Sequence, residues 1–303
     1  MPRGGPIPSA RPWKEYQVPK AHVRQPMLRR YLLFIPLLAG TATTAQVSEL
    51  GGTIGASYYI GDLNPDRHYP RDTKLAGGLV YRYNFNDRYA VRLQGLLGTL
   101  QAYDGDAKDS LQVLRNLHFR SRLIEASLLL EINFFKYRSK GKEGKNWTPF
   151  VFAGLAYFRA APQAQLDDTW YDLQPLGTEG QGTSSRGGEP YPLDHYSIPF
   201  GVGMKWNVGR LDFQLEWGMR RTNTDYVDDV SGTYMNNAVL AFENGPLAAQ
   251  LADQSGLEAT NDDRARGDVN TLDWYVYSGL GITYIITRFT DCEEQYNWMK
   301  RKR

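Results

Sequence analysis

Three polar residues close together in the chain, Asp194, His195 and Ser197, are of the types that a nucleophilic hydrolase uses. Such a triad is set by spatial geometry, however, and no serine of the chain lies in the glycine-flanked motif of a nucleophile elbow. A single histidine beside an acid in a joining segment usually has no catalytic role, so we predict that the chain is not an enzyme. A barrel hydrolase that uses these residues is the alternative from the enzyme class.

Three acidic residues, Asp225, Asp228 and Asp229, lie in one predicted loop and offer hard oxygen ligands of the kind that calcium prefers. Their spacing lacks the pattern and the terminal Glu of an EF-hand loop. We therefore expect solvated loop acids, paired with Arg220 or Arg221, and no metal or cofactor. The single cysteine and the four scattered histidines also lack metal-ligand spacing.

Seven charged residues occur at alternate positions in segments whose other positions are apolar, which is the two-residue period of a β-strand. If such a charged face is enclosed, charges of both signs must pair, because an unpaired buried charge is costly. In a narrow barrel we expect a network of ion pairs that closes the lumen, with a polar pathway as the alternative. The seven residues are Arg82, Arg92, Glu125, Glu131, Lys205, Glu216 and Arg220.

Eight segments share this period, namely residues 50–60, 75–85, 89–103, 119–135, 148–158, 197–207, 211–221 and 273–286. The joins after the second and sixth segments are short, whereas those after the fifth and seventh are the longest. An even number of antiparallel strands with such joins is typical of an outer-membrane barrel whose termini both lie in the periplasm. We predict an all-β fold, an eight-stranded antiparallel up-and-down transmembrane barrel of the outer membrane. A soluble secreted β-sandwich or barrel is the alternative.

Aromatic residues near the ends of the apolar faces favour the membrane barrel, whose outer surface has aromatic girdles at both interfaces. The predicted girdle residues are Tyr81, Tyr83, Phe85, Tyr89, Phe134, Phe135, Trp206 and Trp217.

The N-terminal segment is predicted to be a secretory leader. Residues 1–26 are interpreted as an extension or a mis-assigned start, because Met27 opens a basic and then apolar run like that of a signal peptide. Residues 27–45 form the predicted signal peptide, which is cleaved after Ala45. The apolar run of about ten residues is too short for a membrane anchor. The predicted location is the outer membrane, with the barrel in residues 46–290 and a basic periplasmic tail in residues 291–303.

A basic turn, residues 136–145, is the predicted docking surface for a partner. In the predicted topology this turn faces the periplasm, where its positive charge favours an acidic partner. Simple solvation of the turn is the alternative. The basic residues are Lys136, Arg138, Lys140, Lys142 and Lys145.

The composition of the 303-residue chain excludes two classes of protein. Its 35 basic and 33 acidic residues give a formal charge of +2, which is too balanced for a nucleic-acid-binding surface. Only one apolar run has helical character, whereas a bundle of membrane helices needs about 20 apolar residues for every span.

Four ordered motifs resemble the PorG-like outer-membrane barrel component of the type IX protein secretion system. They are Tyr58 to Pro65, Arg115 to Arg120, Leu173 to Gly182 and Thr224 to Ser231. Tyr275 to Tyr284 resembles the closing strand of that family, and the resemblance covers residues 50–286. The chain departs from the family in its N-terminal extension and in residues 236–268, which we interpret as an ordinary long loop.

The resemblance implies a non-enzymatic envelope protein that acts as a structural or adaptor component of a protein secretion machine. Its implied partners are outer-membrane lipid and the periplasmic ring proteins, a lipoprotein and its partner, with no nucleic acid and no small-molecule substrate. A small porin or solute-binding outer-membrane barrel is the main alternative.

Overall fold

A computed structural model describes residues 47–65, 70–137, 145–256 and 262–288 of the chain. These residues belong to one compact unit, residues 43–303. The predicted N-terminal extension, the predicted signal peptide and the predicted basic tail, residues 291–303, lie outside the described residues.

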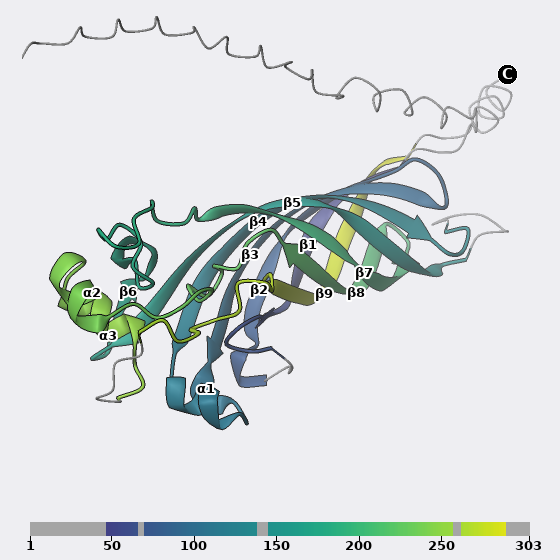
Figure 1. Cartoon of the computed structure of the whole chain (residues 1–303). Helices are drawn as coiled ribbons and strands as arrows, with labels where there is room; N and C mark the ends of the chain where they lie inside the picture. The colour runs from purple at the N-terminus through teal and green to yellow at the C-terminus, as the bar shows by residue number, and fades with distance from the viewer. Residues whose placement is uncertain (1–46, 66–69, 138–144, 257–261, 289–303) are drawn as a thin grey trace, which may run out of the picture. The chain divides into compact units, whose positions relative to one another are not determined.

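The strands form a closed barrel (Figure 1). The barrel strands pair with their neighbours in chain order, all antiparallel, and the last strand, β9, pairs with β1. Pairing of β4 with β5 completes the ring, while the short β6 only extends the free end of β5. This arrangement confirms the predicted eight-stranded antiparallel barrel. The nine strands are β1 (Val47–Ile60), β2 (Lys74–Asn84), β3 (Tyr89–Tyr103), β4 (His118–Asn133), β5 (Trp147–Leu166), β6 (Thr169–Asp172), β7 (Asp194–Val208), β8 (Leu211–Thr222) and β9 (Trp274–Arg288).

All eight predicted segments are barrel strands, but the fifth is longer than predicted. The two-residue alternation of apolar and polar residues weakens after residue 158, yet β5 continues to Leu166. Its extension is stabilised by pairing with β6, whose residues follow a two-residue turn at Asp167 and Asp168, both with positive φ. The hairpin depends on this turn geometry and not on hydrophobic period.

The barrel has the inside-out pattern of a transmembrane barrel. Large apolar side chains point outward and are exposed, for example Leu79 at 73% and Leu155 at 69%. Charged side chains point inward and are buried, with Arg92 and Glu131 at 0%. A water-soluble barrel would reverse this pattern, because exposure of so much apolar surface to water is unfavourable.

Among the described residues, no helix is both long and apolar enough to cross a membrane.

The two ends of the barrel differ. At the turn end, β1 begins at Val47 and β9 ends at Arg288. The short turns at residues 85–88 and 209–210 lie at the same end. The loop end carries four longer connections, in which the helices lie (Figure 1). These helices are η1 (Pro70–Asp72), η2 (Asp104–Asp106), α1 (Ser110–Arg115), η3 (Gln174–Leu176), α2 (Asn237–Glu243) and α3 (Pro246–Ala252).

Residues 236–268 are not the ordinary long loop that we expected, because they contain α2 and α3. The Asn236 side chain accepts hydrogen bonds from the first turn of α2, and Pro246 stands at the start of α3. Leu240 and Ala248 pack together in a small apolar cluster between the two helices. Each helix has only seven residues, so its stability depends on this packing more than on local propensity.

The girdle prediction is wrong at Trp217. Of the predicted residues, Phe85 and Tyr89 at the turn end are outward-facing and exposed, as are Phe134 and Trp206. Trp217 is also outward-facing, but it lies in the middle of β8, opposite Val202 and Ser278. It therefore belongs to the apolar band and not to its edge.

Candidate functional site

The turn-end half of the barrel interior contains an ion-pair network centred on Glu131 of β4. The Glu131 carboxylate lies 2.9 Å from Arg82 Nε and 3.0 Å from Arg92 Nε, and it also pairs with Lys205 Nζ. Arg92 makes a further ion pair with Glu216. Strands β2, β3, β4, β7 and β8 thus all contribute a charge to one buried network, and every one of these side chains is at most 1% exposed.

Glu49 of β1 belongs to the same network, although the sequence pattern did not identify it. It pairs with Arg82 Nη1 at 2.6 Å and accepts hydrogen bonds from Asn84 and Thr283. The alternation that we recognised begins at Leu50, and extending it back by one residue places Glu49 on the inward face. The signal was therefore present in the sequence.

The other two predicted lumen residues form a separate pair nearer the loop end. Arg220 Nε lies 3.4 Å from Glu125 Oε2, and the Tyr275 hydroxyl donates to the same carboxylate at 2.7 Å. Beyond them the interior is mainly apolar, with Leu100, Leu123 and Phe158 fully buried, and it also contains inward polar side chains such as Ser121 and His195. Side chains therefore fill the described barrel at two levels, one mainly charged and one mainly apolar.

The predicted hydrolase residues do not form a triad. Asp194 points outward and pairs with Arg159 at 2.9 Å, whereas His195 and Ser197 point inward. The His195 ring packs against Phe158, and the Ser197 hydroxyl lies 3.4 Å from the Tyr275 hydroxyl. Neighbouring residues of a strand face opposite sides of the sheet, so Asp194 cannot orient His195.

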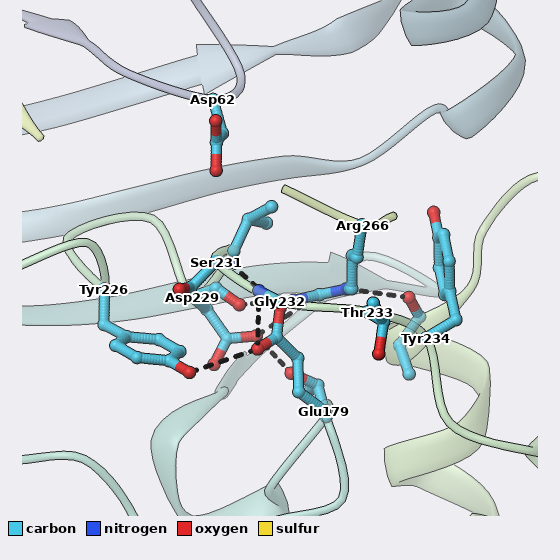
Figure 2. A network of polar contacts seen from close by, with 12 residues as sticks. Asp62, Glu179, Tyr226, Asp229, Ser231, Gly232, Thr233, Tyr234 and Arg266 are labelled. Carbon is cyan, nitrogen blue, oxygen red and sulfur yellow. Dashed lines mark hydrogen bonds and ion pairs between the residues drawn. The ribbon is translucent and has the colours of Figure 1, made fainter. Parts of the chain in front are cut away.

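At the loop end, the connections are joined by a second buried network centred on Arg266 (Figure 2). Its guanidinium group lies 3.2 Å from Glu179 Oε1 and 3.3 Å from Asp229 Oδ2, and it also donates to the carbonyl oxygens of Asp229 and Ala252. Arg266 is 2% exposed. It therefore holds the β5–β7 connection against the β8–β9 connection.

Glu179 binds a turn of the β8–β9 connection directly. Its carboxylate accepts hydrogen bonds from the backbone N–H groups of Ser231 and Gly232 and from the Tyr226 hydroxyl (Figure 2). With Arg266 beside it, this carboxylate has both charge compensation and several donors, which is what a buried carboxylate requires. The name cap is used below for the loop-end residues of the four longer connections that are held together by these contacts and by those described next.

A second contact of the cap joins two acids to one tyrosine. The Tyr59 hydroxyl oxygen lies 2.7 Å from Asp228 Oδ2 and 2.5 Å from Asp273 Oδ1. Burial and the proximity of the two carboxyl groups raise the pKa of Asp228 well above its ordinary value, and burial raises the pKa of Asp273 in the same way. A hydroxyl has one proton to donate, so both contacts are favourable when one carboxyl is protonated and donates to the tyrosine oxygen.

The three candidate metal ligands are buried within the cap and are not solvated loop acids. Asp228 contacts Tyr59, and Asp229 is paired with Arg266 and not with Arg220 or Arg221. Burial raises the pKa of Asp225 to about 7 and that of Asp229 to about 6. In the described part of the chain, no group of three or more His, Cys, Asp or Glu is arranged to hold a metal ion.

The four motifs of the sequence resemblance all meet in the cap. Asp62 of the first motif accepts a backbone hydrogen bond from Asp268 and through its carbonyl oxygen binds Arg115 of the second motif at 2.9 Å. Glu179 of the third motif binds Ser231 of the fourth. Arg266, Tyr59 and Asp273 were not among the predicted site residues, because nothing in their local spacing signals contacts so far along the chain.

The predicted docking turn lies only partly in the described residues. Lys136 is exposed, and the Lys145 ammonium group lies 3.9 Å from the centre of the Phe135 ring. Arg138, Lys140 and Lys142 lie outside the described residues. Both described lysines are at the turn end, in the β4–β5 connection.

Comparisons with known proteins identify a family without an assigned function. The family described as "Domain of unknown function (DUF6089)" matches residues 28–292. No curated protein matches the chain.

Several solved structures are similar to this chain at low identity. Neisserial surface protein A is 10% identical, with 79% of this chain and 97% of that chain covered and a TM-score of 0.37. Ail of Yersinia pestis, solved with the heparin analogue sucrose octasulfate, is 9% identical, with 80% and 98% covered and a TM-score of 0.35. The N-terminal β-barrel domain of Pseudomonas aeruginosa OprF is 13% identical, with 79% and 97% covered and a TM-score of 0.31. At these TM-scores the likenesses carry no argument, and the barrel assignment rests on the strand pairing.

Proposed function

The chain belongs to the DUF6089 family, whose description assigns no activity, and from its geometry we propose a non-enzymatic outer-membrane barrel that serves as a structural or adaptor component of an envelope machine. The observation that carries this proposal is a filled barrel joined to a cap that is held by buried ion pairs. Ion pairs occupy the turn-end half of the lumen and apolar side chains occupy the loop-end half. Such a barrel offers surfaces to its surroundings and not a passage through itself.

The outward apolar surface supports location in the outer membrane. Exposed Leu, Ile and Val side chains cover the barrel wall, and aromatic residues such as Phe85, Tyr89 and Trp206 stand at its turn end. This surface resembles the outward apolar band of membrane barrels, which spans the hydrocarbon core and is flanked by aromatic girdles. The signal peptide expected in residues 27–45 supports the same route.

The finer proposal is a role in type IX protein secretion, in contact with the periplasmic ring formed by a lipoprotein and its partner. It is supported by the sequence resemblance, whose four motifs meet in the cap. The basic turn at residues 136–145 is the proposed contact, since it connects β4 to β5 at the turn end, where β1 begins and β9 ends. Its positive charge would favour an acidic surface on the ring.

A pull-down from gently solubilised outer membranes tests this role. We expect ring proteins to co-purify with the tagged chain and to be identified by mass spectrometry. Charge reversal by Lys140→Glu, Lys142→Glu and Lys145→Glu should reduce their recovery. The matched control is Arg71→Glu with Lys108→Glu, which reverses exposed charges at the loop end and should leave recovery unchanged.

Two results would contradict the proposal at different levels. Recovery of the barrel alone would contradict the adaptor role in secretion but not the membrane location. Absence of the chain from the outer-membrane fraction would contradict the membrane location.

A further inference from the structure

Arginine residues replace apolar ones on the outward faces of β4 and β5 at the loop-end edge of the apolar band. Arg122 is exposed and is the next outward residue after Ile124, while Arg159 is 52% exposed and is the next after Tyr157. In the strand register Arg159 lies opposite Ile124 and Arg122 lies opposite Ala161. The two arginines are therefore diagonal neighbours on one surface, with about 7–8 Å between their strand positions.

Their level along the barrel follows from the aromatic pair beside them. The rings of Tyr157 and Tyr196, both outward-facing, lie 5.5 Å apart and mark the edge of the apolar band. Arg159 is two residues further along the tilted strand, which raises it above this edge by roughly 5 Å. Such a level corresponds to lipid headgroups and not to acyl chains.

The positive charge at this level is only partly compensated by acids. Arg122 makes no ion pair within the described ranges, and Arg159 pairs only with Asp194, which is itself 40% exposed. Arg120, one outward position beyond Arg122, stacks on Trp170 with 3.7 Å from its guanidinium carbon to the ring centre. Arg120 also donates to Gln163, which in turn donates to the exposed Asp172. Three arginines therefore face two exposed acids, of which only Asp194 forms a direct ion pair with one of them, and an ion pair as exposed as that of Arg159 is easily exchanged for another.

We propose that the arginine surface, formed by Arg120, Arg122 and Arg159, binds the phosphate groups of a lipid headgroup in the leaflet at the loop end. This inference rests on the proposed function, because it requires the barrel to span a membrane. The planar guanidinium group matches two phosphate oxygens at once. A lipid fits better than a soluble acid, because the surface is continuous with the exposed apolar side chains of Ile124 and Tyr157, which can contact acyl chains.

Lipid binding to the purified full chain in a neutral detergent tests the proposal. The probe is diphosphorylated lipid A, the competitor is uncharged phosphatidylcholine, and bound lipid is counted by native mass spectrometry. The wild type should retain lipid A in preference to phosphatidylcholine. The double variant Arg122→Gln with Arg159→Gln should bind lipid A more weakly by about tenfold or more. Raised salt should weaken the preference.

Two further variants separate charge from structure. Arg210→Gln at the turn end is the matched control and should leave lipid A binding unchanged, since Arg210 contacts Tyr284 far from this surface. Asp194→Asn frees Arg159 from its only acid and should maintain or raise the affinity. If Asp194→Asn weakens binding as strongly as the arginine variants do, local structure and not arginine charge is responsible, and the proposal is overturned.

Other outcomes are equally decisive. Competition by inorganic phosphate as effective as competition by lipid A would indicate a free-phosphate site and would reject the lipid headgroup. Heat-modifiable migration on gels verifies that each variant still forms a barrel. A chain that fractionates with outer membranes but binds lipid A no better than phosphatidylcholine refutes this inference alone, whereas a chain outside those membranes refutes the proposed function beneath it.

Discussion

At the scale of single residues, Glu131 makes three of the ion pairs inside the barrel. Glu131→Gln would leave Arg82, Arg92 and Lys205 buried with one carboxylate fewer. We expect the free energy of unfolding to fall by about 3–5 kcal/mol, the usual cost of removing one partner from a buried ion pair. Urea unfolding in detergent, followed by gel migration, measures it. Glu189→Gln, which alters an exposed loop acid, should change stability by less than about 0.5 kcal/mol, and equal effects of the two variants would disprove the network.

Arg266 plays the corresponding role in the cap. Arg266→Met removes the cation that Glu179 and Asp229 share, so both carboxylates would be left buried without it. We expect limited proteolysis to cut residues 223–273 faster while the barrel strands stay protected. Arg71→Met is the control, because Arg71 is 71% exposed in its pair with Asp106 and should contribute little. Unchanged cleavage in Arg266→Met would contradict the described contacts.

The buried acids of the cap, two of them at Tyr59, make it sensitive to pH. A carboxyl whose pKa is raised in the folded state stabilises that state at low pH, and this contribution is lost as the pH rises through the raised value. The pKa is raised to about 7 for Asp225 and about 6 for Asp229, and well above the ordinary value for Asp228 and Asp273. We therefore expect amide hydrogen exchange in residues 223–273, corrected for its intrinsic pH dependence, to show less protection at pH 8 than at pH 5.

The variant Asp228→Asn tests the cause of that dependence. An amide can donate to the Tyr59 oxygen without taking up a proton, so the difference between pH 5 and pH 8 should become smaller. Other charged groups face this pair, including Asp62 and Arg115, and they remain unchanged in the variant. Protection that rises with pH in the wild type would show that the sign is wrong.

At the scale of elements, the seam between β1 and β9 depends on close backbone approach. A Cβ atom on Gly51 of β1 would lie 1.9 Å from the Ile282 carbonyl oxygen of β9. Gly51→Ala should therefore displace the two strands and lower the urea midpoint of unfolding. Gly95→Ala on β3 is the matched control, since a Cβ there meets nothing within 4 Å, and it should be neutral. Equal midpoints for both variants would contradict the described seam.

The strands and the cap differ in how far the sequence predicts them. The alternation of Leu50, Ile54 and their neighbours is local, so it predicts β1 and its orientation without knowledge of any partner. The helices α2 and α3 lack such a signal, because seven-residue helices are stabilised by packing against the other connections. β6 and the end of β5 were missed because their hairpin depends on the turn at Asp167 and Asp168 and not on hydrophobic period.

At the scale of the whole molecule, the filled interior predicts that the barrel does not conduct. Purified protein reconstituted in planar bilayers should show no single-channel steps, because Glu131 and its partners occupy one level of the lumen and Leu100, Leu123 and Phe158 occupy the other. The control is a conducting porin in the same bilayers. Reproducible conductance steps would favour the porin alternative and would contradict the argument that is based on the filled lumen.

The sequence by itself determined the strand periods, which face of each strand is charged and the closed eight-stranded barrel that follows from them. These features depend on the pleat, which repeats every two residues whatever the strand pairs with. Only the tertiary structure decided which charges meet. Arg82 and Glu131 lie 49 positions apart and Glu179 and Arg266 lie 87 apart, so their contacts depend on strand register and on how the connections fold over the barrel. Local pattern carries no information about contacts at such separations, which is why the cap could not be predicted from the four motifs that form it.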